Sequence, residues 1–279
     1  MHIAAGEIEE LILPAGPHRW RVLKSGMGPV ALCLHGAGGS ADSFKPLMGA
    51  LSSKLTIVAP DLPGHGGTRL GSSARSGLEP IAEDVAMLLD KLRIAPEFTI
   101  GHSAGAAVSL ELDQVLSPQG HVLINAALSE FEGLAGWVFP AMAKGLSLTP
   151  FAADFLARNL SRDEKLRGLL ESTGSDVTEE ILLRYQGLAQ NREHVNGTLK
   201  MMAAWDLKPL LNRMRSIRTR TLLVAANKDG TVPVSVSKKA KQTLYDAELI
   251  LHEGGHLLHE ERPQLVADDI SRFFALPDT

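Results

Sequence analysis

The sequence predicts an α/β fold in which a mostly parallel, eight-stranded sheet is flanked by helices. Short apolar runs alternate with helical patterns along most of the 279 residues. Runs without polar alternation are typical of strands that are buried on both faces, as in a parallel sheet. One long stretch of helical patterns interrupts this alternation, and it indicates a helical insertion between two strands.

Eight segments are predicted as strands. The first two follow each other without an intervening helix, and we expect an antiparallel pair from them: Ile8–Leu13 and Arg19–Lys24. The other six are continuous apolar runs: Pro29–His35, Leu55–Pro60, Phe98–Gly101, His121–Asn125, Thr221–Ala225 and Ala247–Leu251. Five helical patterns separate or follow these runs, as expected when helices cover both faces of a sheet: Ala41–Ser52, Glu79–Leu92, Ala104–Leu116, Val236–Tyr245 and Pro263–Phe274.

The stretch from Glu130 to Asp206 contains several helix starts and no predicted strand. Ser161 and Asp176 each stand three residues before a glutamate, which is the spacing of a capping box with the first residue as N-cap. We therefore expect a core formed by residues 1–129 and 207–279, and a helical cap formed by residues 130–206. The cap follows the sixth strand, so it should cover the carboxyl edge of the sheet, where open α/β sheets bind ligands.

Composition excludes several classes of protein. The chain has 28 Lys and Arg against 32 Asp and Glu, a net charge of −4, which does not favour nucleic-acid binding. A single cysteine, Cys33, excludes an internal disulfide framework and a multi-cysteine metal site. We expect no secretory signal, because the first ten residues are acidic and lack an apolar run. The longest apolar stretch, Gly133–Ala143, is far shorter than the roughly 20 residues that span a membrane. The expected location is the cytoplasm, with peripheral attachment to a membrane as the alternative.

A candidate nucleophile lies between a predicted strand and a predicted helix. Residues 101–105 read GHSAG, and in that context a G-x-S-x-G pattern places its serine on a tight, strained turn. Small flanking residues let the strand and the helix approach closely and leave the hydroxyl exposed. A glycine-rich turn without catalytic function could have the same five-residue sequence, but it would not need a strand before it and a helix after it. The sequence therefore predicts Ser103 as a nucleophile.

A glycine-rich loop, HGAGGS at residues 35–40, ends an earlier strand. Acyl transfer creates an oxyanion, which needs backbone N–H donors that are already in position. We expect the N–H groups of Ala37 and Ala104 to form this oxyanion hole. A phosphate-binding loop is the alternative, but neither G-x-x-x-x-G-K-[ST] nor G-x-G-x-x-G occurs here.

Two further candidates follow the last two strands. Asp229 lies in a turn after Thr221–Ala225, and His256 follows Ala247–Leu251. An aspartate in a D-G turn can serve the turn alone. The order nucleophile, acid, histidine along the chain, however, is that of a known class of serine hydrolases. We predict that Asp229 fixes the tautomer of His256, which takes the proton of Ser103.

Residues 252–256, HEGGH, match the H-E-x-x-H zinc motif, which requires both histidines on one helix. Gly254 and Gly255 would each cost about 1 kcal/mol relative to alanine inside a helix. The preceding residues also predict a strand. We therefore expect His252 at the strand end, His256 in a loop and no zinc, with His259 as a structural histidine beside them.

Together these motifs resemble the α/β-hydrolase superfamily, because HGAGGS, PDLPGHGGT, GHSAG, NKDGTVP and GGHLLHEERP occur in its order over nearly the whole chain. The resemblance implies the α/β-hydrolase fold and no metal or organic cofactor. Ser103 argues against relatives with an aspartate nucleophile, namely haloalkane dehalogenases and epoxide hydrolases. C–C bond hydrolases remain an alternative, although they usually carry tryptophan after the catalytic histidine, where this chain has Leu257.

A finer resemblance rests on GHSAGAA, FEGLAG, STGS and MMAAWDL, which lie largely in the expected cap. These segments are similar to the magnesium-chelatase accessory proteins of bacteriochlorophyll biosynthesis. The resemblance implies a role near magnesium insertion into protoporphyrin, with magnesium chelatase as a partner. It names no reaction, because the family is defined by its pathway.

The expected cap is rich in apolar residues, and most of them should pack onto the sheet. We expect Trp137, Phe139 and Trp205 to face the Ser103 pocket, which would suit a hydrophobic ester or a flat macrocycle. The first hypothesis is a serine hydrolase that acts on such an ester through an acyl-enzyme. The second is a non-catalytic module that binds a porphyrin or assists the chelatase, because one fold can serve many functions.

Overall fold

Eight strands form one sheet in the computed structural model, which describes residues 7–129 and 163–277. Along the sheet they follow the order β1-β2-β4-β3-β5-β6-β7-β8. The strand β2 is antiparallel to β1 and β4, whereas all neighbours from β4 to β8 are parallel. The predicted fold class and the leading antiparallel pair are thus confirmed. The strands are β1 (Ile8–Ala15), β2 (His18–Ser25), β3 (Val30–Leu34), β4 (Thr56–Pro60), β5 (Phe98–His102), β6 (Gly120–Ile124), β7 (Thr221–Ala226) and β8 (Ala247–His252).

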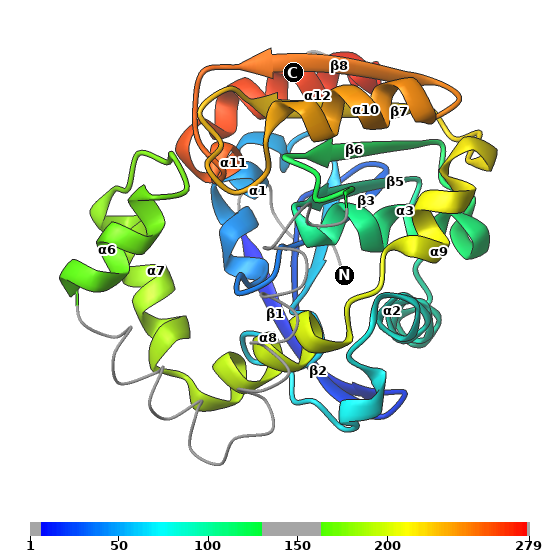
Figure 1. Cartoon of the computed structure of the whole chain (residues 1–279). Coiled ribbons are helices and arrows are strands. Elements are labelled where there is room, and N and C mark those ends of the chain that lie inside the picture. The colour runs from blue at the N-terminus through cyan, green and yellow to red at the C-terminus, as the bar shows by residue number, and fades with distance from the viewer. Residues whose placement is uncertain (1–6, 130–162, 278–279) are drawn as a thin grey trace.

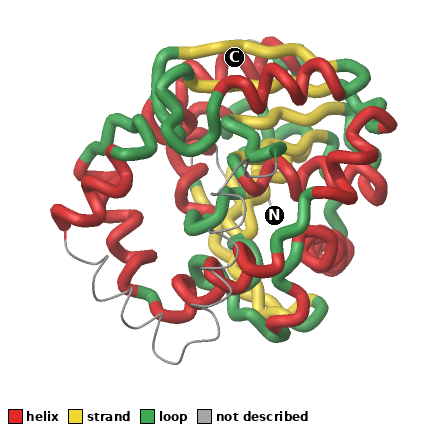
Figure 2. The backbone as a smooth tube through the Cα atoms, viewed as in Figure 1, coloured by secondary structure: helices red, strands yellow, loops and turns green. Residues whose placement is uncertain are grey.

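Helices cover both faces of this sheet (Figures 1 and 2). One face packs against α2 (Leu78–Leu92), α3 (Ala104–Leu116), α9 (Lys208–Arg213) and α10 (Val234–Thr243). The other face packs against α1 (Lys45–Leu51), α11 (Leu258–Glu261) and α12 (Pro263–Phe273). Short 3-10 helices complete the core: η1 (Ala41–Phe44), η2 (Ser73–Arg75) and η3 (Met214–Ser216). None of the helices in the described ranges is both long enough and apolar enough to cross a membrane.

Alternating side chains of the central strands fill both cores. In β3, Leu32 and Leu34 belong to the core beneath α2 and α3, whereas Ala31 and Cys33 belong to the core beneath α1 and α12. All four side chains are fully buried. Since successive side chains of a strand point to opposite faces, a strand covered on both sides must be apolar at every position. This is why the strands appear in the sequence as unbroken apolar runs.

The predicted helix Ala41–Ser52 is divided into two parts, and a proline accounts for the division. The 3-10 helix η1 ends at Phe44 and α1 begins at Lys45, with Pro46 in its first turn. Proline has no N–H to donate to the carbonyl of Asp42, and its ring would clash with that carbonyl in a continuous helix. The other four predicted helices are present: Ala104–Leu116 matches α3 at both ends, and the other three have ends shifted by one or two residues. The pattern does not predict α11.

The described residues between β6 and β7 include three helices that precede α9: α6 (Asp163–Glu171), α7 (Glu179–Gln190) and α8 (Arg192–Ala204). Of these inserted helices, α6 to α8, the first two pack on a small core of their own, which also includes Leu257 beside His256. The third, α8, contributes Met201 to the core beneath α2 and α3. The predicted N-cap Asp176 is wrong, because α7 begins at Glu179 and the cap is Thr178. Its Oγ1 accepts a hydrogen bond from the Ile181 N–H at 3.3 Å. The other predicted cap, Ser161, lies outside the described residues.

Candidate active site

Ser103 occupies a strained turn between β5 and α3. Its backbone angles are φ 51° and ψ −116°, in a region that L-residues rarely adopt. The glycines on either side leave room for this turn. A Cβ on Gly101 would lie 2.5 Å from the Gly105 carbonyl oxygen, and a Cβ on Gly105 would lie 2.0 Å from the carbonyl oxygen of Leu34. Glycine is therefore required at both ends of the GHSAG motif.

Backbone hydrogen bonds fix the same turn to the end of β6. The Ser103 N–H donates to the carbonyl of Ile124 at 3.0 Å, and the Ser103 carbonyl accepts from the Ala127 N–H at 3.1 Å. The serine is buried, with 9% of its surface exposed, and it lines a cavity. The turn is thus held by β5, β6 and α3 together, which offsets the cost of its conformation.

Asp229 and His256 are joined by a hydrogen bond of 2.7 Å between Oδ2 and Nδ1. The carboxylate accepts two more hydrogen bonds at Oδ1, from the N–H groups of Thr231 (2.7 Å) and Val232 (2.8 Å). Its side chain is fully buried. Because the carboxylate can only accept, Nδ1 carries the proton and Nε2 of His256 is left as the basic nitrogen.

Ser103 and His256 line the same cavity. The hydrogen bonds among residues 7–129 and 163–277 do not include one between the Ser103 hydroxyl and the His256 ring. Such contacts are often long in unliganded enzymes and shorten when the substrate binds. The structure therefore joins Asp229 and His256 by a hydrogen bond, and it places Ser103 in the lining of the cavity that His256 also lines.

Asn125, which is not among the site residues predicted from the sequence, ties the His256 loop to the sheet. Its amide Nδ2 donates to the carbonyls of Gly255 (3.0 Å) and His256 (2.9 Å), and its Oδ1 accepts from the Ala226 N–H (2.8 Å). Asparagine also tolerates the φ of 45° that the chain adopts at this position. One feature of the sequence indicates a role for this residue. Asn125 is a polar residue directly after a buried strand, and Asp229 likewise follows a buried strand, three residues after its end.

The loop between α6 and α7 holds the turn after β7 and the loop after β8 together. The Thr173 carbonyl accepts hydrogen bonds from the N–H groups of both Gly230 (2.9 Å) and His256 (3.2 Å). Close backbone contact makes this possible, because a Cβ on Gly255 would lie 2.2 Å from the carbonyl carbon of Gly174. The inserted helices therefore help to position the candidate acid and base.

Two backbone N–H groups near Ser103 are available as donors. Ala104 opens α3, where N–H groups have no intrahelical acceptor. None of the hydrogen bonds between described residues uses the N–H of Ala37. His194 on α8 supports the loop that carries Ala37: its Nδ1 accepts from the Gly66 N–H (3.0 Å), so its Nε2 carries the proton and donates to the Gly38 carbonyl (3.2 Å).

The cavity beside Ser103 has a volume of about 1040 Å³. Trp205, one of the predicted pocket residues, lines it; Trp137 and Phe139 lie outside the described residues. The inserted helices contribute a mainly aliphatic wall: Leu166, Leu169, Leu170, Leu188, Ala189, Val195, Leu199, Met201 and Met202. A wall of this composition favours an apolar ligand.

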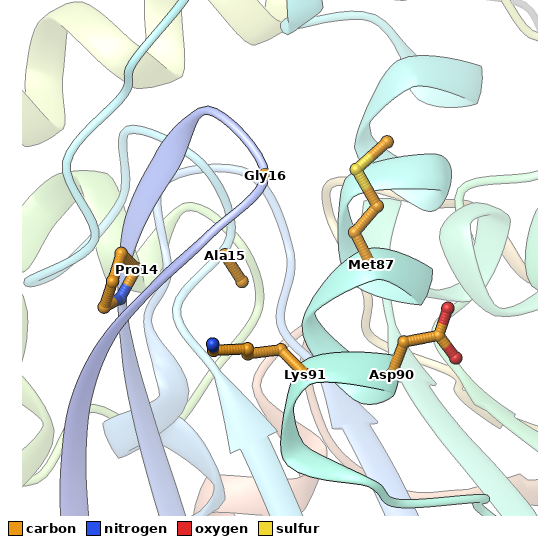
Figure 3. A pocket seen from close by; sticks show the side chains of 6 residues that line it. All are labelled: Pro14, Ala15, Gly16, Met87, Asp90 and Lys91. Carbon is orange, nitrogen blue, oxygen red and sulfur yellow. The ribbon is translucent and has the colours of Figure 1, made fainter.

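A second hollow lies between the β1–β2 hairpin and α2, and Figure 3 shows Met87, Asp90 and Lys91 projecting from that helix. Its six lining residues include no hydroxyl, thiol or imidazole group. This hollow therefore offers none of the chemistry found around Ser103.

The HEGGH segment does not form a helix. The strand β8 ends at His252, whose Nε2 bonds to Asp269 on α12 at 2.5 Å, and residues 253–257 form a loop. His252 and His256 thus face different partners, as the strand-end prediction requires. His259 is fully buried, and its ring lies against that of His102 at a tilt of 39°, with the ring centroids 4.3 Å apart.

Several histidines are buried around the site and are held neutral. Burial lowers the pKa of His65, His194 and His259 to about 3 and that of His35 to about 4, and it lowers the pKa of His102 well below its ordinary value. A charged imidazolium would lose its hydration in these positions, and neighbouring imidazoles would repel it.

We expect this group to make the fold sensitive to acid. A histidine in the unfolded chain titrates near 6.5, above the folded pKa, so the unfolded state binds more protons as the pH falls below about 6.5. Each buried histidine then removes about 1.4 kcal/mol of stability per pH unit, until the pH reaches its folded pKa. These five histidines together should lower the free energy of unfolding, measured with urea, by roughly 7 kcal/mol between pH 7.5 and pH 5.5. His65→Asn should lessen the slope, and equal stability of the wild type at the two pH values would contradict the expectation.

The alpha/beta hydrolase family matches this chain over residues 31–269, and the chain belongs to this family. The chain is similar to the magnesium-chelatase 30 kDa subunit of Rhodobacter capsulatus, with 42% identity over 258 residues, which cover 92% of this chain and 89% of that protein. Among solved structures it resembles an esterase from Thermogutta terrifontis (TM-score 0.72, 18% identity, 96% of this chain and 98% of that one). It also resembles the epoxide hydrolase CorEH (TM-score 0.80, 19% identity, 96% of this chain and 99% of that one). These two structures show the fold.

Proposed function

We propose that this protein is a serine hydrolase that acts on a hydrophobic ester, with Ser103 as nucleophile, His256 as base and Asp229 as the acid that orients it. The observation that carries the proposal is the bond from His256 Nδ1 to Asp229, which leaves Nε2 basic in a cavity that also holds the strained Ser103. The aliphatic wall of this cavity supports an apolar substrate. Residues 130–206 act as its cap in this proposal.

The reaction follows from these positions. His256 Nε2 takes the Ser103 proton while the serine oxygen bonds to the ester carbonyl carbon, and the N–H groups of Ala37 and Ala104 donate to the oxyanion. The C–O bond then breaks, and His256 gives its proton to the leaving alcohol. Water next attacks the acyl-enzyme and loses a proton to His256, which returns it to Ser103 as the acid departs.

Labelling with a fluorophosphonate tests this proposal. The wild-type protein should be labelled at Ser103, and Ser103→Ala should not be labelled. Ser109→Ala removes a buried hydroxyl of α3 that has no hydrogen-bond partner among the described residues, and this variant should be labelled like the wild type. A folded wild-type protein that resists the reagent would contradict the proposed nucleophile.

A second candidate function is binding of a porphyrin or assistance to magnesium chelatase without catalysis. The observation that favours it is the 42% identity to a protein named as a subunit of that enzyme. If a porphyrin occupies the cavity, excess protoporphyrin should slow the labelling of Ser103. Unchanged labelling in the presence of saturating protoporphyrin would argue against a porphyrin in this cavity.

A further inference from the structure

We propose that the substrate of this site carries an anionic group, such as a carboxylate, on its apolar body, and that the ammonium of Lys239 binds this group. The inference deepens the proposed function, because it names the class of ester that the cavity selects. It rests on the charges of the lining, on the position of Lys239 in α10 and on the arrangement of the two walls.

Among the described residues that line the cavity, none is an aspartate or a glutamate. Burial holds the imidazoles of His102 and His194 neutral, and it raises the pKa of the Tyr185 hydroxyl well above its ordinary value. His256 has its Nδ1 proton shared with a carboxylate outside the lining. Lys239 therefore supplies the positive charge of the described lining, and no described carboxylate faces it there.

Lys239 reaches the cavity because of its place on α10. Ser235 and Val236, which also line the cavity, precede it by four and three residues and thus lie on the same side of the helix. Lys238, Lys239 and Lys241 on this helix are all exposed, and only Lys239 among them lines the cavity. The ammonium of Lys239 forms no ion pair with any described residue, so it remains available to a ligand.

The cavity has two chemically different sides. The Lys239 side also carries the hydroxyl groups of Thr231 and Ser235. The lining residues of α6 and α8 are mainly aliphatic, and His194 and Thr198 are the polar ones among them. Figure 1 shows α10 near the top of the view and α8 near the bottom. An ester with an apolar body and a carboxylate matches this arrangement. Its apolar body would contact the aliphatic side chains, and its carboxylate would contact the ammonium and the hydroxyl groups.

Two esters of equal chain length test the inference: p-nitrophenyl decanoate, which is neutral, and the mono-p-nitrophenyl ester of decanedioic acid, which carries a carboxylate. Lys239→Gln should raise KM for the carboxylate ester about 10-fold, the size expected for loss of a hydrogen bond to a charged group. KM for the neutral ester should change by less than about twofold, which is within the usual effect of a surface substitution. Lys239→Arg should restore the preference, and Lys238→Gln should leave both esters unaffected.

Equal effects of Lys239→Gln on the two esters would overturn the inference. An effect of Lys238→Gln as large as that of Lys239→Gln would also overturn it, since the cause would then be the general field of the helix. If the wild type hydrolyses neither ester, this result contradicts the proposed hydrolase function but does not test the role of Lys239. Calorimetric titration with decanoate and decan-1-ol then decides the charge preference: tighter binding of decanoate, lost in Lys239→Gln, supports it, and equal binding overturns it.

Discussion

Ser103→Ala should lower kcat for p-nitrophenyl esters by roughly four to six orders of magnitude, because in the proposed mechanism it removes the atom that bonds to the acyl group. Loss of the nucleophile leaves only the contributions of the oxyanion hole and of substrate binding. The variant should fold like the wild type, since alanine has less bulk and the turn is held by backbone bonds to Ile124 and Ala127. Steady-state kinetics and thermal melting measure the two effects.

Ser109→Ala serves as the matched control, because it removes another serine hydroxyl from the same part of the chain. Its hydroxyl has no partner in the described structure, and kcat should stay within about twofold of the wild-type value. Wild-type kcat in Ser103→Ala would exclude the proposed nucleophile. In a bacteriochlorophyll-producing host, normal pigment with Ser103→Ala in place of the native gene would instead favour the non-catalytic candidate function.

Gly105→Ala should destabilise the fold by about 3 kcal/mol or more, the upper part of the range for overpacking a core. The added Cβ would lie 2.0 Å from the Leu34 carbonyl oxygen and 2.7 Å from that of His35. Both are backbone atoms of β3 and the loop after it, so neither can move aside as the end of a flexible side chain could. Relief requires α3 to move away from β3, which would also displace Ser103.

Gly187→Ala is the control for this experiment. Gly187 lies inside α7, and a Cβ added there would have no described heavy atom within 4 Å beyond its own helix backbone and chain neighbours. Alanine should therefore stabilise the helix by up to about 1 kcal/mol. Urea unfolding gives both free energies. A Gly105→Ala variant as stable and as active as the wild type would show that the close packing of α3 on β3 is not required.

Much of the candidate site could be predicted, because the same local pattern recurs along this chain: a predicted strand is followed by a residue with a reactive or charged side chain. Ser103 and Asp229 follow buried strands at the carboxyl edge of the sheet, and the structure places His256 just beyond β8. Unbroken apolar runs predict such strands, and parallel strands bring their carboxyl ends to one edge. The glycines of GHSAG are likewise a local requirement, since they flank the strained serine in sequence.

The fold class, the order of the strands along the chain and the residues that end them can be predicted from the sequence, because apolar periodicity and turn chemistry are local properties. Which distant residues support the candidate site depends on the tertiary structure. Asn125 bonds to His256 across 131 positions, and His194 bonds to Gly38 across 156. The Thr173 carbonyl accepts hydrogen bonds from Gly230 and His256, and no sequence pattern predicts either contact. Such contacts depend on how whole elements pack against one another, and residue spacing along the chain carries no record of that packing.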